Sequence, residues 1–127
     1  MRTLPHPNTN EIELARVLEA LSDPTRLAVV AFLALGDGEP FETRCGDFQA
    51  FGSKTNLTYH LAKLREAGVT QTRIAGTSRY ISLRRADLEA RFPGVLDTLI
   101  TAALSEPERA ALVRAAQAEA ASLAAAS

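Results

Sequence analysis

The chain has 127 residues, 46% of them hydrophobic and 23% charged, which is the composition of one ordinary globular domain. Its net charge of −1 argues weakly against nucleic-acid binding, and its single cysteine, Cys45, excludes a disulfide within the chain. The longest apolar run, residues 27–35, is about half of a membrane span, and the first residues contain no apolar signal core. We therefore expect a cytoplasmic protein that does not contact a membrane.

The first third of the chain predicts an arm and two helices. Residues 1–9 are proline-rich and are expected to form a loose arm ahead of a single domain over residues 10–127. Apolar residues at helical spacing predict a helix over residues 10–21, with Asn10 as its N-cap. A second helix should begin at Asp23 or Ser22, carry Pro24 in its first turn and end at Gly36. Apolar residues lie all round this second helix, so we expect it to be buried.

The remainder of the chain predicts more helices and a β-hairpin. Residues 45–50 are expected to form one short helix, with Phe48 and Phe51 in the core. A helix over residues 53–68 is followed by strands 71–75 and 79–83, which meet around Gly76. A short helix over 86–91 and a helix over 95–104 come next. The last helix, residues 105–125, opens with a Ser-x-x-Glu capping box at Ser105 and Glu108.

The predicted helix over residues 53–68 has two unlike faces. Leu57, Leu61 and Leu64 repeat at helical spacing and form one narrow apolar stripe. The first carboxylate of the helix is Glu66, and the other faces carry short polar groups, two lysines and an aromatic ring. Such a surface is suited to contact with another molecule. Its residues are Ser53, Lys54, Thr55, Asn56, Thr58, Tyr59 and Lys63.

Positive charge is concentrated in the same third of the chain. Between residues 53 and 85, seven basic residues accompany one acidic residue, a net charge of +6, whereas the rest of the chain carries −7. A docking surface responds to local charge, so this segment can attract an anionic partner. The seven basic residues are Lys54, Lys63, Arg65, Arg73, Arg79, Arg84 and Arg85.

A polar, basic helix followed at once by a hairpin with arginine near its turn indicates a winged helix–turn–helix, a mainly α fold with a small β wing. The helix would enter the major groove of double-stranded DNA, and Arg73, Thr77 and Arg79 of the wing would contact backbone phosphates or the minor groove. The DNA-binding residues expected on the helix are those of its polar surface. A second hypothesis is a protein-interaction module that uses the same basic face for an acidic partner.

Three stretches of the sequence together resemble the ArsR (arsenic-repressor) family of bacterial winged-helix regulators. They are LSDPTRLAVVAFL, SKTNLTYHLAKLREAGV and RIAGTSRYISL, and the resemblance as a whole extends over roughly residues 11–104. Their matching positions include Asp23-Pro24-Thr25-Arg26, His60-Leu61 and Ala67-Gly68, with Arg73, Gly76, Tyr80 and Leu83 in the wing. The resemblance implies a homodimer of the bacterial nucleoid that binds an inverted-repeat operator, usually as a repressor released by an inducer.

The chain departs from that family's metal-sensing pattern. Family members sense metal through a Cys-x-Cys pair or through Asp, His and Glu on the last helix, but Cys45 stands alone and residues 105–125 contain no His or Cys. We therefore expect no metal and no cofactor, and an inducer that is a non-metal small molecule or an oxidant. Cys45 is either a small buried apolar residue or a thiol sensor, since Arg44 beside it would favour the thiolate.

No residue set for catalysis assembles, so an enzyme is not expected. Apolar residues on the end helices exceed what one small core can cover, which predicts a dimer through the N- and C-terminal helices. The alternative is that these helices pack together within one monomer. The residues concerned are Ile12, Leu14, Val17 and Leu18 on the first helix, and Leu112, Val113 and Leu123 on the last.

Overall fold

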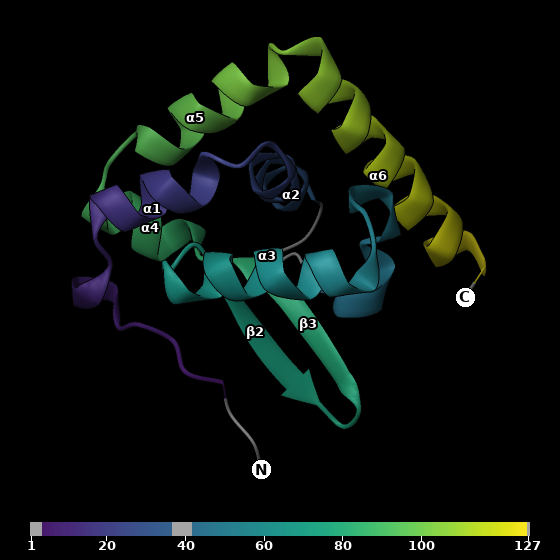
Figure 1. Cartoon of the computed structure of the whole chain (residues 1–127), viewed down its shortest axis with the longest axis horizontal. Coiled ribbons are helices and arrows are strands. Elements are labelled where there is room, and N and C mark those ends of the chain that lie inside the picture. Colours follow the sequence, from purple (N-terminus) through teal and green to yellow (C-terminus); the bar gives the residue numbers. More distant parts are fainter. Residues whose placement is uncertain (1–3, 37–41, 127) are drawn as a thin grey trace.

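The computed structural model describes residues 4–36 and 42–126. One buried helix, α2 (Pro24–Ala34), is seen end-on at the centre of Figure 1 and is surrounded by the other helices. Helices α5 (Val95–Leu104) and α6 (Pro107–Ala126) arch over one side of α2, and α3 (Lys54–Glu66) crosses the opposite side. The strands β2 (Thr70–Ala75) and β3 (Ser78–Leu83) project beyond α3 as a wing.

The remaining elements are short and connect these parts of the fold. They are the 3₁₀ turns η1 (Thr9–Glu11), η2 (Cys45–Asp47) and η3 (Gln49–Phe51), the strand β1 (Thr43–Arg44), and the helices α1 (Leu14–Leu21) and α4 (Arg85–Arg91). The structure thus has the helical core and β wing of a winged helix, as predicted.

The first helix begins later than expected. Asn10 does not cap it. Instead the Asn8 N–H donates to the Glu11 carboxylate at 2.7 Å and the Glu11 N–H donates to the Asn8 carbonyl at 2.9 Å, which closes η1, and α1 starts at Leu14. The prediction was wrong here because a short-range polar turn competes with the helix for the same residues. The turn directs Ile12 into the core, where it is 1% exposed.

Helix α2 forms as the sequence predicts. The Asp23 carboxylate accepts hydrogen bonds from the backbone N–H groups of Thr25 and Arg26 at 2.8 and 3.0 Å, while Pro24 occupies the first turn. All six residues from 28 to 33 are buried. The rings of Phe48 and Phe51 pack on Phe32 with centroids about 6 Å apart, which anchors η2 and η3 to α2.

The segment before α3 contains a strand that the sequence did not predict. Instead of one helix near 45–50 there are two 3₁₀ turns, and β1 pairs antiparallel with β3, so the sheet order is β1-β3-β2. Strand β1 has only two residues, too few for an alternating pattern to be recognised. The wing is therefore a three-stranded sheet at its base and a hairpin at its tip.

Helix α3 is closed at both ends by the residues predicted for this purpose. The Ser53 hydroxyl accepts from the Asn56 N–H at 3.3 Å, and Gly68 follows the helix with φ of +86°. The N–H groups of Gly68 and Val69 donate to Arg65 and Leu64 carbonyls, which is the Schellman pattern. A Cβ on Gly68 would lie 2.6 Å from Ile12 Cγ1, so the turn is also a close approach between chain segments.

Part of the apolar surface expected at the chain ends belongs to the monomer core. Helix α6 packs on α2 and η3, with Val113 only 1% exposed, and Ile12 and Val17 are buried as well. The expectation that these three residues remain for an interface was wrong. Helix α6 folds back over its own α2 and buries Val113, while Ile12 lies against Gly68 and Val17 belongs to the core cluster. Leu14, Leu18 and Leu123 remain exposed, with exposed fractions of 41–44%.

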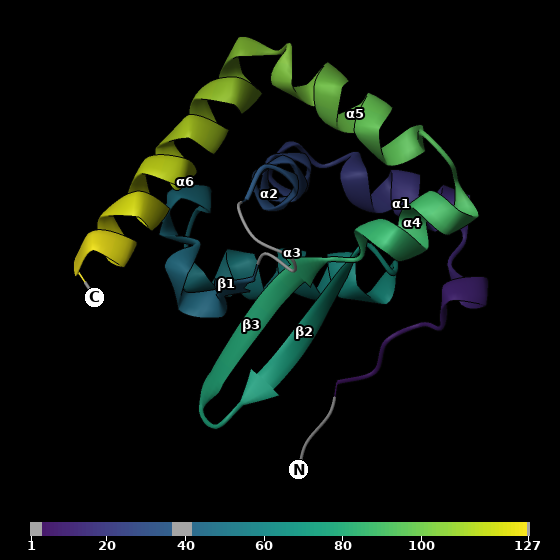
Figure 2. The same ribbon diagram turned by 180° about the vertical axis from the view of Figure 1, so that it is seen from behind.

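The described part of the N-terminal arm has no helix or strand before Thr9, yet hydrogen bonds hold it to the domain. The Thr72 N–H at the outer edge of β2 donates to His6 Nε2 at 3.0 Å, and Arg84 donates to the Pro7 carbonyl at 2.7 Å. The Thr9 hydroxyl donates to Asp87 and, with Arg84, lowers the pKa of that carboxyl. The arm therefore runs beside β2 (Figure 2) and covers part of an open sheet edge.

We predict that Gly68→Ala destabilises the fold more than Gly76→Ala does. Both glycines have positive φ, but only at Gly68 does a Cβ meet another side chain. Urea denaturation should show losses in the free energy of unfolding of about 2–4 kcal/mol for Gly68→Ala and about 1 kcal/mol for Gly76→Ala. Equal losses would mean that the close approach of Ile12 to Gly68 does not add to the cost of a side chain at this position.

Docking of the arm should weaken at acidic pH. Burial lowers the pKa of His6 below its ordinary value, and the positive charges of Arg65 and Arg84 lower it further. A hydrogen bond with the Leu4 backbone raises this pKa but does not outweigh the other effects. The free chain therefore takes up the proton first, so docking is intact above about pH 6.5 and weakens as pH falls below it. The protection factor of the Thr72 amide against hydrogen exchange should fall in that range, whereas that of the Arg73 amide, directed towards β3, should stay unchanged. Unchanged protection at Thr72 would contradict the prediction.

Candidate nucleic-acid interface

Helix α3 exposes the residues that the sequence singled out. Leu57, Leu61 and Leu64 are 5% exposed or less and fix one side of α3 to the domain. All seven polar residues of its predicted contact surface are exposed: Ser53, Lys54, Thr55, Asn56, Thr58, Tyr59 and Lys63. Figure 1 shows α3 unobstructed by α5 and α6, which lie on the other side of α2. The helix thus offers a continuous polar surface to a partner.

Several groups on this surface are already oriented. The Thr58 hydroxyl donates to the Lys54 carbonyl at 2.9 Å, which leaves its methyl group and oxygen lone pairs available. The Lys63 ammonium lies 5.6 Å from the ring centre of Tyr59, a cation–π distance. Within the described part of the chain, the Asn56 side-chain amide makes no hydrogen bond, so its donor and acceptor are free for a ligand.

The wing meets the start of α3 across a hollow of about 740 Å³, called here the wing–helix hollow. Gly76, with φ of +62°, makes the tight turn that brings Thr77 and Arg79 to this place. Its wall combines hydroxyl groups with three cationic side chains. The lining residues are Arg44, Cys45, Gly46, Gln49, Gly52, Lys54, Leu57, Thr58, Thr77, Ser78 and Arg79.

Arg73 is placed differently from Arg79, although both were expected to contact DNA. Its guanidinium makes two hydrogen bonds to the Glu42 carboxylate, at 3.0 and 2.9 Å, and stacks on Tyr80 with 4.6 Å to the ring centre. These hydrogen bonds hold the pKa of Glu42 below its ordinary value. Among residues 4–36 and 42–126, no carboxylate pairs with Arg79. The positive charge of Arg79 is therefore less compensated than that of Arg73.

The basic segment of the sequence is not one basic patch. Arg84 pairs with Asp87 at 3.0 Å with its side chain only 8% exposed, and Arg85 pairs with Asp97 at 3.1 Å. Both acidic partners lie outside residues 53–85, so counting charges within that window overestimated the field at the interface. Lys54, Lys63 and Arg79 remain as exposed cations on α3 and the wing.

Sequence reasoning missed the contribution of the segment before α3. Arg44 and Gln49 line the wing–helix hollow from β1 and η3. The charge of Arg44 is shared with Asp47, whose carboxylate lies 3.7 Å away. No motif marks these residues; the pairing of β1 with β3 brings them here.

Cys45 is half-buried and lines the same hollow, while the neighbouring Arg44 is directed to Asp47. Over residues 4–36 and 42–126, no three His, Cys, Asp or Glu side chains are grouped so as to hold a metal ion. In the same ranges, no helix has the length and apolar character needed to cross a membrane.

Comparison with known proteins agrees with this geometry. No protein-family model matches the chain. YceK of Bacillus subtilis (strain 168), an uncharacterised HTH-type transcriptional regulator, is 38% identical over 90 residues, which is 67% of this chain and 84% of YceK. With that identity over most of the relative, and with a winged-helix fold, the chain belongs to the HTH-type transcriptional regulators.

Proposed function

We propose that the protein is a homodimeric, sequence-specific repressor of the ArsR type that binds an inverted-repeat operator in double-stranded DNA. The observation that carries the proposal is the exposed polar surface of α3 beside the cationic wing–helix hollow. The contact residues that we assign are Ser53, Lys54, Thr55, Asn56, Thr58, Tyr59 and Lys63 on α3, with Thr77 and Arg79 on the wing. Arg73 is assigned a supporting role, because its charge is paired with Glu42.

Base reading is assigned to the first two turns of α3. A recognition helix enters the major groove with its N-terminal turns foremost, and those turns carry Thr55, Asn56 and Tyr59. The Asn56 amide suits adenine N6 and N7, and a threonine methyl suits the thymine methyl. The leucine stripe supports this assignment because it holds the opposite side of α3 against the domain.

The wing–helix hollow is suited to a backbone phosphate. Lys54 and Arg79 approach it from α3 and β3, and Thr58 and Thr77 add hydroxyl groups. A phosphate held between helix and wing would fix the register of α3 in the groove without reading sequence. Lysine and arginine at such a place contribute affinity that depends on salt.

Dimerisation is assigned chiefly to α1. Leu14 and Leu18 lie on its exposed side, while Val17, Ala20 and Leu21 bury the other side. Exposed leucines one turn apart on a short helix are suited to pairing with a second copy. A two-fold axis through such a contact would present two recognition helices to successive major grooves, about 34–36 Å apart.

Release from the operator by a non-metal inducer or by thiol oxidation is part of the same proposal. Cys45 lines the wing–helix hollow, so an oxygen atom or adduct on its sulfur would occupy space that we assign to the phosphate. Reduced and oxidised protein can be compared on the same duplex to test this.

The main test selects bound sequences from random duplexes and then compares Asn56→Ala with Asn10→Ala. Asn56→Ala should lose about 1–3 kcal/mol on the selected duplex and relax one base position per half-site. Asn10 is exposed outside α3 and should be silent. If the wild-type protein selects no sequence and its binding ignores duplex sequence, the acidic-protein alternative is favoured.

Arg79 and Arg73 should differ in salt dependence. Arg79→Gln should reduce the slope of log K against log salt by roughly one unit per half-site, because an unpaired cation on a phosphate releases counterions. Arg73→Gln should change the slope less, since Glu42 already balances that charge. Filter binding across a salt series measures both slopes, and equal changes would contradict the assigned roles.

Leu18→Glu should convert the dimer to a monomer and abolish tight operator binding, because it places a charge in the assigned α1 interface. Leu35→Glu is the matched control, since Leu35 is exposed by 45% and Leu18 by 44%. Sedimentation equilibrium should separate the two variants. A Leu18→Glu protein that stays dimeric would move the interface away from α1.

A further inference from the structure

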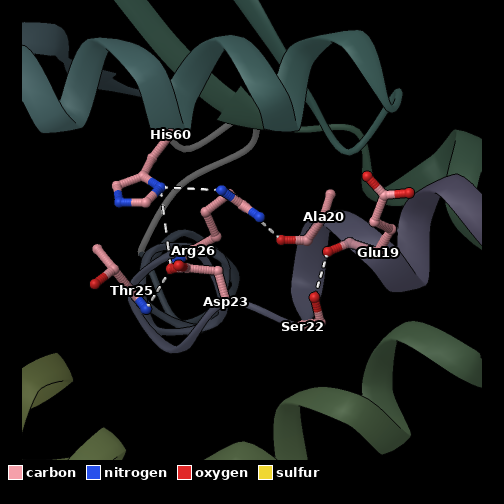
Figure 3. Close-up of polar contacts among 7 residues, drawn as sticks. All are labelled: Glu19, Ala20, Ser22, Asp23, Thr25, Arg26 and His60. Carbon is pink, nitrogen blue, oxygen red and sulfur yellow. Dashed lines mark hydrogen bonds and ion pairs between the residues drawn. The ribbon is translucent and has the colours of Figure 1, made fainter.

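Arg26 joins three helices through its guanidinium. It lies in the first turn of α2, where its Nε donates to the Ala20 carbonyl near the end of α1 at 2.6 Å. Its Nη1 lies 3.1 Å from Nδ1 of His60 in the middle of α3 (Figure 3). One half-buried side chain therefore connects the helix assigned to dimerisation with the helix assigned to DNA.

The Asp23 carboxylate lies close to the same contact. It caps α2 and lies 4.0 Å from His60 Nδ1 (Figure 3). Burial alone would raise the pKa of Asp23, but the Arg26 N–H and nearby positive charge outweigh it, so that this pKa lies below its ordinary value. Asp23 thus keeps a negative charge beside the Arg26–His60 contact.

The contact assigns a role to Nδ1 of His60. A guanidinium has donors only, so in this geometry the Nδ1 lone pair accepts from Arg26 Nη1. The ring also meets Tyr59 edge-on, with centroids 5.6 Å apart. Tyr59 is 57% exposed, and its ring contacts Lys63 as well as His60.

We propose that Arg26 and His60 are positioning residues for DNA recognition: their contact sets α3 relative to α1 and orients the Tyr59 ring for a base. Neither residue belongs to the surface that we assign to DNA contact. The inference rests on the proposed function and adds the elements that pre-organise its reading surface, where small displacements weaken specific contacts. It also links the dimer helix to the recognition helix through two consecutive hydrogen bonds.

Four variants separate positioning from general stability. Arg26→Met removes both hydrogen bonds and keeps an apolar stem, and His60→Leu removes the acceptor. His60→Asn retains an acceptor near the place of Nδ1 and should act as the rescue. Arg91→Met is the matched control, because Arg91 also bridges two segments, donating to the Ile12 carbonyl at 3.2 and 2.7 Å, without a hydrogen bond to α3.

The first readout needs no DNA. The chain has two tyrosines, so NMR of ¹³C-labelled tyrosine distinguishes Tyr59 from Tyr80. Arg26→Met and His60→Leu should shift or broaden the Tyr59 ring signals and leave those of Tyr80 in place, while Arg91→Met leaves both unchanged. The ¹⁵N spectrum of wild-type His60 should show the proton on Nε2.

The second readout is selectivity, the ratio of affinities for the selected duplex and a scrambled duplex. Arg26→Met and His60→Leu should each lower it about tenfold, with little change in binding to the scrambled duplex, and the double variant should lose no more than either single one. His60→Asn should recover most of the selectivity. Thermal unfolding of each variant defines a temperature at which all remain folded.

The outcomes are distinct for the two levels of proposal. If the wild-type protein shows selectivity and both variants keep it, losing only thermal stability as Arg91→Met does, the positioning role is wrong. Unchanged Tyr59 signals in Arg26→Met and His60→Leu overturn it as well. If the wild-type protein selects no duplex, the proposed function fails, whereas the Tyr59 signals still decide whether the contact orients that ring.

Discussion

Burial of α2 is the constraint on which the rest of the structure depends. Each of its residues from 28 to 33 is 3% exposed or less, and α1, α3, α5, α6, η3 and β3 all contact this helix. A buried Val, Leu or Phe side chain contributes about 1.5–3 kcal/mol, so four such residues on one helix favour complete enclosure strongly. Each surrounding element covers a different part of the surface of α2. Their positions are therefore set by one another as well as by their own sequences.

The position of α3 illustrates this constraint. Three leucines attach it to the domain along one stripe, and the remaining circumference must face outward. Helices α5 and α6 cover the opposite side of α2 and leave the outer surface of α3 clear (Figure 1). The wing follows α3 directly and extends past it. The polar surface and the cationic hollow thus arise from the same packing that closes the core.

Electrostatics at the interface is decided by pairing between distant parts of the chain. Glu42 forms an ion pair with Arg73, Asp87 with Arg84, and Asp97 with Arg85. What remains outward is a small set of cations around the wing–helix hollow, not a uniformly basic segment. The solvent-exposed pairs Arg73–Glu42 and Arg85–Asp97 contribute little to stability. Together with Arg84–Asp87, however, they determine which charges are available to a partner.

The sequence by itself determined the features that depend on near neighbours. The caps at Asp23 and Ser53, the turn at Gly68 and the stripe of α3 follow from residues within about one or two turns of each other, and the structure confirms them. The order of a helical core, recognition helix and hairpin followed from the same local patterns. The resemblance to winged-helix regulators depended on these same residues.

Only the tertiary structure decided which distant groups meet. Arg73 and Glu42 are 31 residues apart, Arg26 and His60 are 34 apart, and His6 and Thr72 are 66 apart. Strand β1 is too short to show an alternating sequence pattern. The sequence predicts an apolar face on α6 for a partner, but in the tertiary structure α6 packs on α2. Such contacts have no signature in local periodicity, because they depend on how helices and strands pack once each has formed.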